Sequence, residues 1–81
     1  MLIDDSRVNQ SIGEQIKEIR KKSGRYQWQV AADAEISETT LCTIEKGRFN
    51  IKIVDLIRIA KSLHTDPVEM VRRAIEEAEG W

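Results

Sequence analysis

The chain has 81 residues, enough for one small domain, and its net charge is −1. Few aromatic residues, one Pro and many Ile, Ala, Glu, Lys and Arg favour an all-α protein over a β-sandwich or barrel. A single Cys and a single His exclude an internal disulfide and a zinc site, and no apolar run suits a signal peptide or a membrane span. We therefore expect a reduced, cytoplasmic protein with no metal, no cofactor and no small-molecule ligand.

The charges are unevenly distributed along the chain. Residues 11–27 and 48–61 each carry a net charge of +3, whereas residues 28–47 and 62–81 each carry −3. Two basic segments thus flank an acidic one, which indicates a molecule with one basic face. Chance clustering of charges on a small helical protein is the alternative.

The first expected helix covers residues 11–23. Residues 1–10 show no useful period and are interpreted as a flexible N-terminal arm. Ser11 and Glu14 have the spacing of a capping box, and an apolar stripe of isoleucines begins at Ile12. Gly24 is a typical stop signal.

Two short helices are expected next, over residues 26–34 and 37–46. Ser37 can cap the second of them, while Ile36 and Leu41 have the spacing of a hydrophobic staple. A short helix, a tight turn and a second short helix form the layout of a helix-turn-helix. On a helical wheel, the outward face of the second helix carries short polar side chains, namely Glu38, Thr39, Cys42 and Thr43. Short side chains permit close approach to another surface, which favours an interface.

The segment after Gly47 offers Arg48, Asn50 and Lys52 as groups that can contact phosphate, although it can equally be a solvated connector. A helix over residues 53–63 should follow. Its expected core stripe is Ile53, Leu56, Ile57, Ala60 and Leu63. His64 lies where a C-cap with positive φ is often needed, so we interpret it as a cap and not as a ligand or base.

The last expected helix covers residues 67–79, with Asp66 as its N-cap, and residues 80–81 form a tail. This helix is apolar over more than one face. A seam of Val71, Ala74, Ile75 and Ala78 therefore predicts a twofold homodimer interface. The alternative is that this seam covers the first helix or the N-terminal arm.

These features together resemble the Cro/C1-type (XRE-like) helix-turn-helix domain of phage repressors and small bacterial regulators. The resemblance runs from Ile12 to about Met70. It depends on IGEQIKEIRKKSG at 12–24, IEKG at 44–47, and an ordered set of single positions: Gln27, Val30, Ala31, Ile36, Ser37, Thr40, Leu41, Leu56, Ala60 and Leu63.

The resemblance implies a five-helix, lambda-repressor-like domain that binds double-stranded DNA as a homodimer. Glu38, Thr39 and Thr43 match its base-reading positions. Arg20 and Glu45 match an ion pair between the first and third helices. Gln27, Arg48 and Asn50 match positions near phosphate. Adding the nearby polar and basic residues gives the expected phosphate-contacting set: Gln27, Arg25, Lys46, Arg48, Asn50 and Lys52.

The chain also departs from the family pattern. Arg25 and Tyr26 stand where the family usually has an apolar residue followed by Ser or Thr, so the second helix lacks its usual cap. Glu35 replaces a Gly common in the turn, which suggests either a turn geometry that tolerates a side chain or some local strain. Trp28 is unusually large for its position, and neither its role nor that of Trp81 follows from the sequence.

The expected function is sequence-specific transcriptional regulation, as a repressor or autoregulator that binds a two-half-site operator. The alternative is an antitoxin or a restriction–modification controller protein whose main partner is another protein, such as a toxin or polymerase. Cys42 and His64 show no catalytic pairing and no glycine-rich phosphate loop is present, so no enzymatic activity is expected.

Overall fold

A computed structural model describes residues 4–79, and this range contains five helices and no strand. The helices are α1 (Asp5–Lys22), α2 (Gln27–Ala34), α3 (Glu38–Glu45), α4 (Ile53–Ser62) and α5 (Pro67–Glu79). The predicted all-α, five-helix fold is confirmed. The expected tail at residues 80–81 lies outside the described range.

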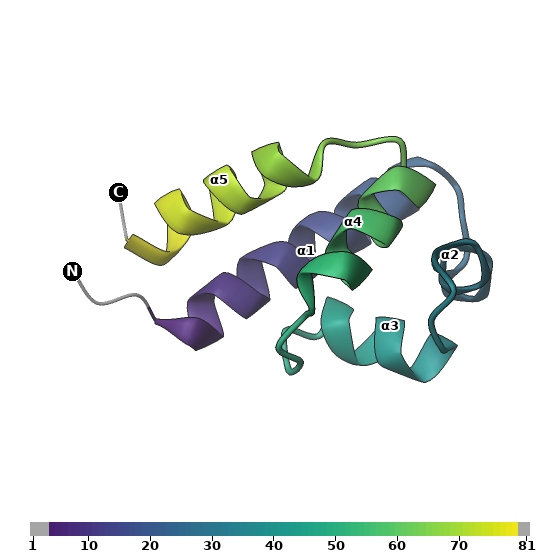
Figure 1. The fold of residues 1–81 in the computed structure, drawn as a ribbon, viewed down its shortest axis with the longest axis horizontal. Coiled ribbons are helices and arrows are strands. Elements are labelled where there is room, and N and C mark those ends of the chain that lie inside the picture. The colour runs from purple at the N-terminus through teal and green to yellow at the C-terminus, as the bar shows by residue number, and fades with distance from the viewer. Residues whose placement is uncertain (1–3, 80–81) are drawn as a thin grey trace.

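The helices are arranged around α1, which is the longest (Figure 1). α5 lies alongside α1 on one side, and α3 packs against α1 on another. α2 contacts both α3 and α4, so the expected helix-turn-helix is held against the rest of the domain by α1 and α4. No helix within residues 4–79 is long and apolar enough to cross a membrane.

The start of α1 differs from the sequence prediction. The helix begins at Asp5, where the side chain of Asp4 caps it by accepting from the backbone N–H of Ser6 at 2.9 Å. Ser11 is therefore inside the helix and buried, and its hydroxyl donates to Glu77 on α5 instead of capping. The prediction of a flexible arm is wrong for residues 5–10, and residues 1–3 of that arm lie outside the described range. The apolar period of residues 5–10 was too weak to detect because only Val8 among them packs against the core.

The helix-turn-helix follows the predicted outline. Ser37 caps α3, with its hydroxyl oxygen accepting from the backbone N–H of Thr40 at 3.0 Å. Tyr26 provides no side-chain cap for α2, and the side chain of Gln29 accepts from the Tyr26 N–H instead. Glu35 adopts a left-handed conformation with φ of 59°. Glycine adopts this conformation most readily, which agrees with the glycine that the resemblance implies at this position.

The predicted stripe of α4 is partly confirmed, since Leu56, Ala60 and Leu63 are buried, but Ile59 outside that stripe is buried as well. Ile59 is fully buried, whereas Ile53 is 70% exposed and Ile57 is 39% exposed. The apolar residues of α4 cover more than one face, so helical spacing alone did not determine which face enters the core. His64 has φ of 55° after the end of α4, as expected of a cap.

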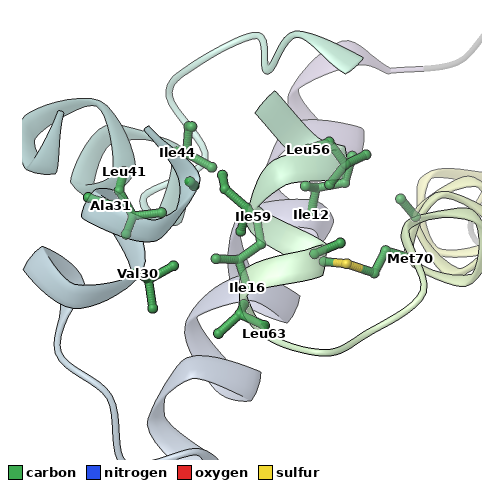
Figure 2. Close-up of a cluster of buried hydrophobic side chains, with 13 residues drawn as sticks. Ile12, Ile16, Val30, Ala31, Leu41, Ile44, Leu56, Ile59, Leu63 and Met70 are labelled. Atoms are coloured by element: carbon green, nitrogen blue, oxygen red, sulfur yellow. The ribbon is translucent and has the colours of Figure 1, made fainter. Parts of the chain in front are cut away.

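The single core joins all five helices, and Figure 2 shows Ile16 and Ile59 near its centre, with Met70 entering from α5. Ala74 is also part of this core, and Ala78 is 6% exposed. The predicted dimer seam is therefore wrong for these two alanines, because both are buried within one chain. The alternative interpretation, in which the seam covers the first helix, agrees with the extensive α1–α5 contact.

Candidate nucleic-acid interface

The three predicted base-reading residues lie on one concave surface of α3. Glu38, Thr39 and Thr43 line a hollow of about 340 Å³ together with Gln27, Cys42 and Lys46. Glu38 and Thr39 are exposed, and Thr43 is half-buried. The hydroxyl of Thr43 donates to the carbonyl oxygen of Thr39 at 3.0 Å, which orients this side chain in the free protein. The surface thus combines a carboxylate acceptor with two short side chains.

A buried ion pair fixes α3 against α1. Nε of Arg20 lies 2.7 Å from Oε2 of Glu45, and Nη2 of Arg20 lies 3.0 Å from Oε1. These hydrogen bonds raise the pKa of Arg20 above its ordinary value. The two side chains are only 10% and 3% exposed. This is the pair expected from the family resemblance, and its bidentate geometry sets the orientation of α3 relative to α1.

Gln27 joins the first turn of α2 to the same carboxylate. Its Nε2 donates to Oε1 of Glu45 at 3.0 Å, and the residue is half-buried. One amide N–H is thus engaged within the protein, while the side chain still lines the hollow beside α3. Gln27 therefore lies at the edge of the α3 surface that carries Glu38, Thr39 and Thr43.

Three cations surround the C-terminal end of α3 and the following loop. Lys46, Arg48 and Lys52 are exposed, and none of them forms an ion pair among the residues that the structure describes. Asn50 is also exposed, and its side-chain oxygen accepts from Nδ2 of Asn9 at 2.7 Å. The loop is thus fixed to α1 while its charged side chains remain available.

Arg25 departs from its predicted role. Its Nη1 donates to the carbonyl oxygen of Ser62 at 2.7 Å and to the Ser62 hydroxyl at 3.0 Å, while its Nη2 pairs with Asp33. The guanidinium holds the pKa of Asp33 below its ordinary value through a hydrogen bond and its charge. Because Arg25 ties α2 to the end of α4, we leave it out of the phosphate-contacting set.

Two further cations were not assigned to the site from the sequence. Lys17 and Lys21 line a second hollow of about 370 Å³, which also touches Gln27, Cys42 and Lys46. The basic segment at residues 11–27 was visible in the charge distribution. A helical wheel that placed both lysines beside Arg20 would have assigned them to the α3 side of α1.

A separate apolar groove lies between α4 and α5. It has a volume of about 430 Å³ and is lined by Ile53, Leu56, Ile57, Pro67, Val68, Val71, Arg72 and Ile75. The most exposed members are Val68, at 74%, and Ile53, at 70%. Val71 and Ile75 of the predicted dimer seam belong to this groove. Contiguous exposed apolar surface is a common feature of interaction sites in proteins.

A family model described as a helix-turn-helix domain matches residues 11–72. A search of curated proteins found no match. The restriction–modification controller protein C.Esp1396I is 27% identical and superposes with a TM-score of 0.74, covering 86% of this chain and 91% of that one.

Two other solved structures are similar. A mutant of C.Esp1396I bound to its operator site OM is 26% identical, has a TM-score of 0.75 and covers 89% of this chain and 95% of that one. An HTH_3 family transcriptional regulator from Vibrio cholerae is 26% identical, has a TM-score of 0.78 and covers 86% of this chain and 39% of that one. The predicted resemblance, and the class of DNA-binding transcriptional regulator, are confirmed.

Proposed function

We propose that this chain, which belongs to the helix-turn-helix domain family, acts in the cytoplasm as a homodimer. The homodimer represses or autoregulates transcription by binding an operator with two half-sites. The proposal depends chiefly on one observation. Glu38, Thr39 and Thr43 of α3 share one concave surface with Lys46, which forms no ion pair within residues 4–79. A helix of this kind fits the major groove of DNA, while the flanking cations and Gln27 contact phosphates.

Each side chain has a chemical role in this proposal. The carboxylate of Glu38 is repelled by phosphate, but it can accept from the N4 amino group of cytosine. Thr39 can donate to or accept from a base edge. The Thr43 hydroxyl proton is directed to the Thr39 carbonyl, so its oxygen is left to accept and its methyl group to contact thymine.

A homodimer is supported by the groove between α4 and α5. Four of the exposed large apolar side chains in the described part of the chain line it: Ile53, Ile57, Val68 and Ile75. A second copy that presents the same surface would remove them from water in an isologous contact. The half-sites for the two α3 helices of a dimer are expected about 34 Å apart, which is one helical turn of DNA.

A restriction–modification controller role is the second candidate. It is favoured by the 27% identity to C.Esp1396I over 86% of this chain. A gene for a restriction enzyme next to the gene for this chain would support it. An adjacent toxin gene, or a second chain that co-purifies, would favour the antitoxin alternative.

The test is enrichment of duplexes from a randomised pool at low salt, followed by gel shifts with a titration of protein. We expect a two-half-site sequence to be enriched and its affinity to fall steeply with salt. Replacing Thr39 and Thr43 together by Ala should change the enriched sequence, since each mismatched base pair in a recognised site typically costs about 1–3 kcal/mol. An unchanged preference would contradict the assignment of α3 as the reading helix, and no enrichment at all would contradict DNA binding.

A further inference from the structure

Two lysines of α1 lie beside the proposed DNA surface without a counter-charge. Lys17 and Lys21 are four residues apart and exposed. Neither forms an ion pair within residues 4–79, and the nearby carboxylate of Glu18 pairs instead with Lys22 at 3.0 Å. Like charges four residues apart on a helix repel one another, so the proximity of the two lysines does not itself stabilise α1.

The packing of α1 on α3 places these lysines next to the reading surface. A Cβ added at Gly13 would lie 2.3 Å from the carbonyl oxygen of Ile44, so the two helices approach closely at the last turn of α3. Lys17 follows Gly13 by about one turn of α1. It therefore emerges close to the end of α3, where Lys46 begins the loop.

The hollow that Lys17 and Lys21 line is continuous with the reading surface. The two hollows share Gln27, Cys42 and Lys46. The acid in the second hollow, Glu45, is already neutralised by Arg20 and bonded by Gln27. Three lysines thus surround a concave surface whose buried acid is paired, and a bound polyanion would meet net positive charge there.

We propose that Lys17 and Lys21 contact the phosphate backbone of the same duplex that α3 reads, so that the DNA surface extends from α3 onto α1. This inference rests on the proposed function. The two lysines would position the duplex and add affinity without adding sequence preference, because phosphate contacts do not discriminate among bases. Lys46 connects this surface to the reading residues of α3.

The test replaces both lysines by Gln and measures affinity for the enriched duplex at several salt concentrations. Each lost phosphate contact lowers the slope of log K against log salt by about 0.9, so the loss of two contacts in each subunit should lower the slope by about 3.6 for a K17Q/K21Q homodimer on a two-half-site duplex. The enriched sequence should remain the same. The matched control is R58Q/K61Q, which removes the same charge from exposed positions on α4 that line neither hollow.

The outcomes separate this inference from the proposed function. Equal slopes in the two double variants would show a general charge effect and overturn the α1 site while leaving DNA binding intact. A loss of thermal stability in K17Q/K21Q with an unchanged slope would show that the lysines serve the C-terminal end of α3, and would also overturn it. If the unmodified chain enriches no duplex, the proposed function and this inference fail together.

Discussion

The side-chain amide of Asn9 donates a 2.7 Å hydrogen bond to the side-chain oxygen of Asn50, which ties the second turn of α1 to the loop after α3. The same turn also leaves no space for a side chain at Gly47 in the loop, because a Cβ there would lie 2.9 Å from Cα of Gln10. The N-terminal extension of α1 therefore fixes the loop that carries Arg48 and Asn50. Its role is structural support for the proposed phosphate contacts.

Replacing Asn9 by Ala should lower the free energy of unfolding by about 0.5–1 kcal/mol, the usual net value of one hydrogen bond. Urea denaturation of N9A, N50A and the double variant measures the coupling between the two residues. A coupling near zero would show that the bond contributes nothing to the fold. Weaker duplex binding by N9A, with the same sequence preference, would support its role in holding the loop.

Gly13 should tolerate no side chain. Alanine is favoured over glycine inside a helix by about 1 kcal/mol, but at this position its Cβ would overlap the backbone oxygen of Ile44. Overpacking of this kind costs about 1–3 kcal/mol or more, so G13A should be less stable in urea denaturation.

The matched control for Gly13 is G24A. Gly24 has φ of +69° but no atom within 4 Å of an added Cβ, so only backbone strain of about 1 kcal/mol is expected there. A G13A variant as stable as the unmodified chain would contradict the close approach of α1 and α3.

Replacing Glu35 by glycine should make the folded chain more stable. Its φ of 59° is unfavourable for a residue with a side chain, whereas glycine adopts this conformation readily. E35G should therefore raise the free energy of unfolding by up to about 1 kcal/mol, after the greater freedom of glycine in the unfolded chain is subtracted. E35A keeps the strained conformation and should show no gain. Equal stability of the two variants would mean that the turn is not strained.

The ion pair between Arg25 and Asp33 should make stability depend on pH. Arg25 lowers the pKa of Asp33 in the folded chain below its ordinary value of 3.8. Stabilisation from this group is therefore present above the unfolded-state pKa and is lost as the pH falls through the folded-state pKa. D33N should be less stable than the unmodified chain at neutral pH, and the difference in urea midpoint should shrink below about pH 3.8.

The control for Asp33 is E14Q, since Glu14 is exposed and forms no ion pair in the described part of the chain. The urea midpoint of E14Q should equal that of the unmodified chain at each pH. A difference between D33N and the unmodified chain that stayed constant with pH would show that the carboxylate charge is not what Arg25 recognises.

Local chemistry made much of the fold predictable. The cap at Ser37 and the positive φ at His64 depend on residues close in the sequence. The outward face of α3 followed from helical geometry alone, and Glu38, Thr39 and Thr43 do share one surface. These features needed no knowledge of tertiary packing.

Long-range contacts were not predictable in this way. Arg25 donates a hydrogen bond to Ser62, which is 37 residues away in the sequence, and Asn9 donates one to Asn50, which is 41 residues away. No local sequence pattern predicts either bond. The choice between Ile53 and Ile59 for the core depended on how α4 lies against α1, α2 and α5. The predicted dimer surface was partly wrong for the same reason, because Ala74 was already covered within the chain.

The proposed dimer can be tested at Ile53. This side chain is 70% exposed and lines the groove between α4 and α5, so I53E should leave the fold intact while placing a charge at the interface. Burying an unpaired charge is costly, so I53E should be a monomer at concentrations where the unmodified chain is a dimer in sedimentation equilibrium. Its binding to a two-half-site duplex should weaken much more than its binding to a single half-site.

V54E is the matched control for I53E, because Val54 is the next residue of α4, is 52% exposed and does not line the groove. It should dimerise and bind DNA like the unmodified chain. Dissociation of V54E as readily as I53E would place the interface elsewhere on α4. A dimer that survives I53E would assign the groove to a different partner, and in that case a co-purifying second chain would be the expected occupant under the antitoxin alternative.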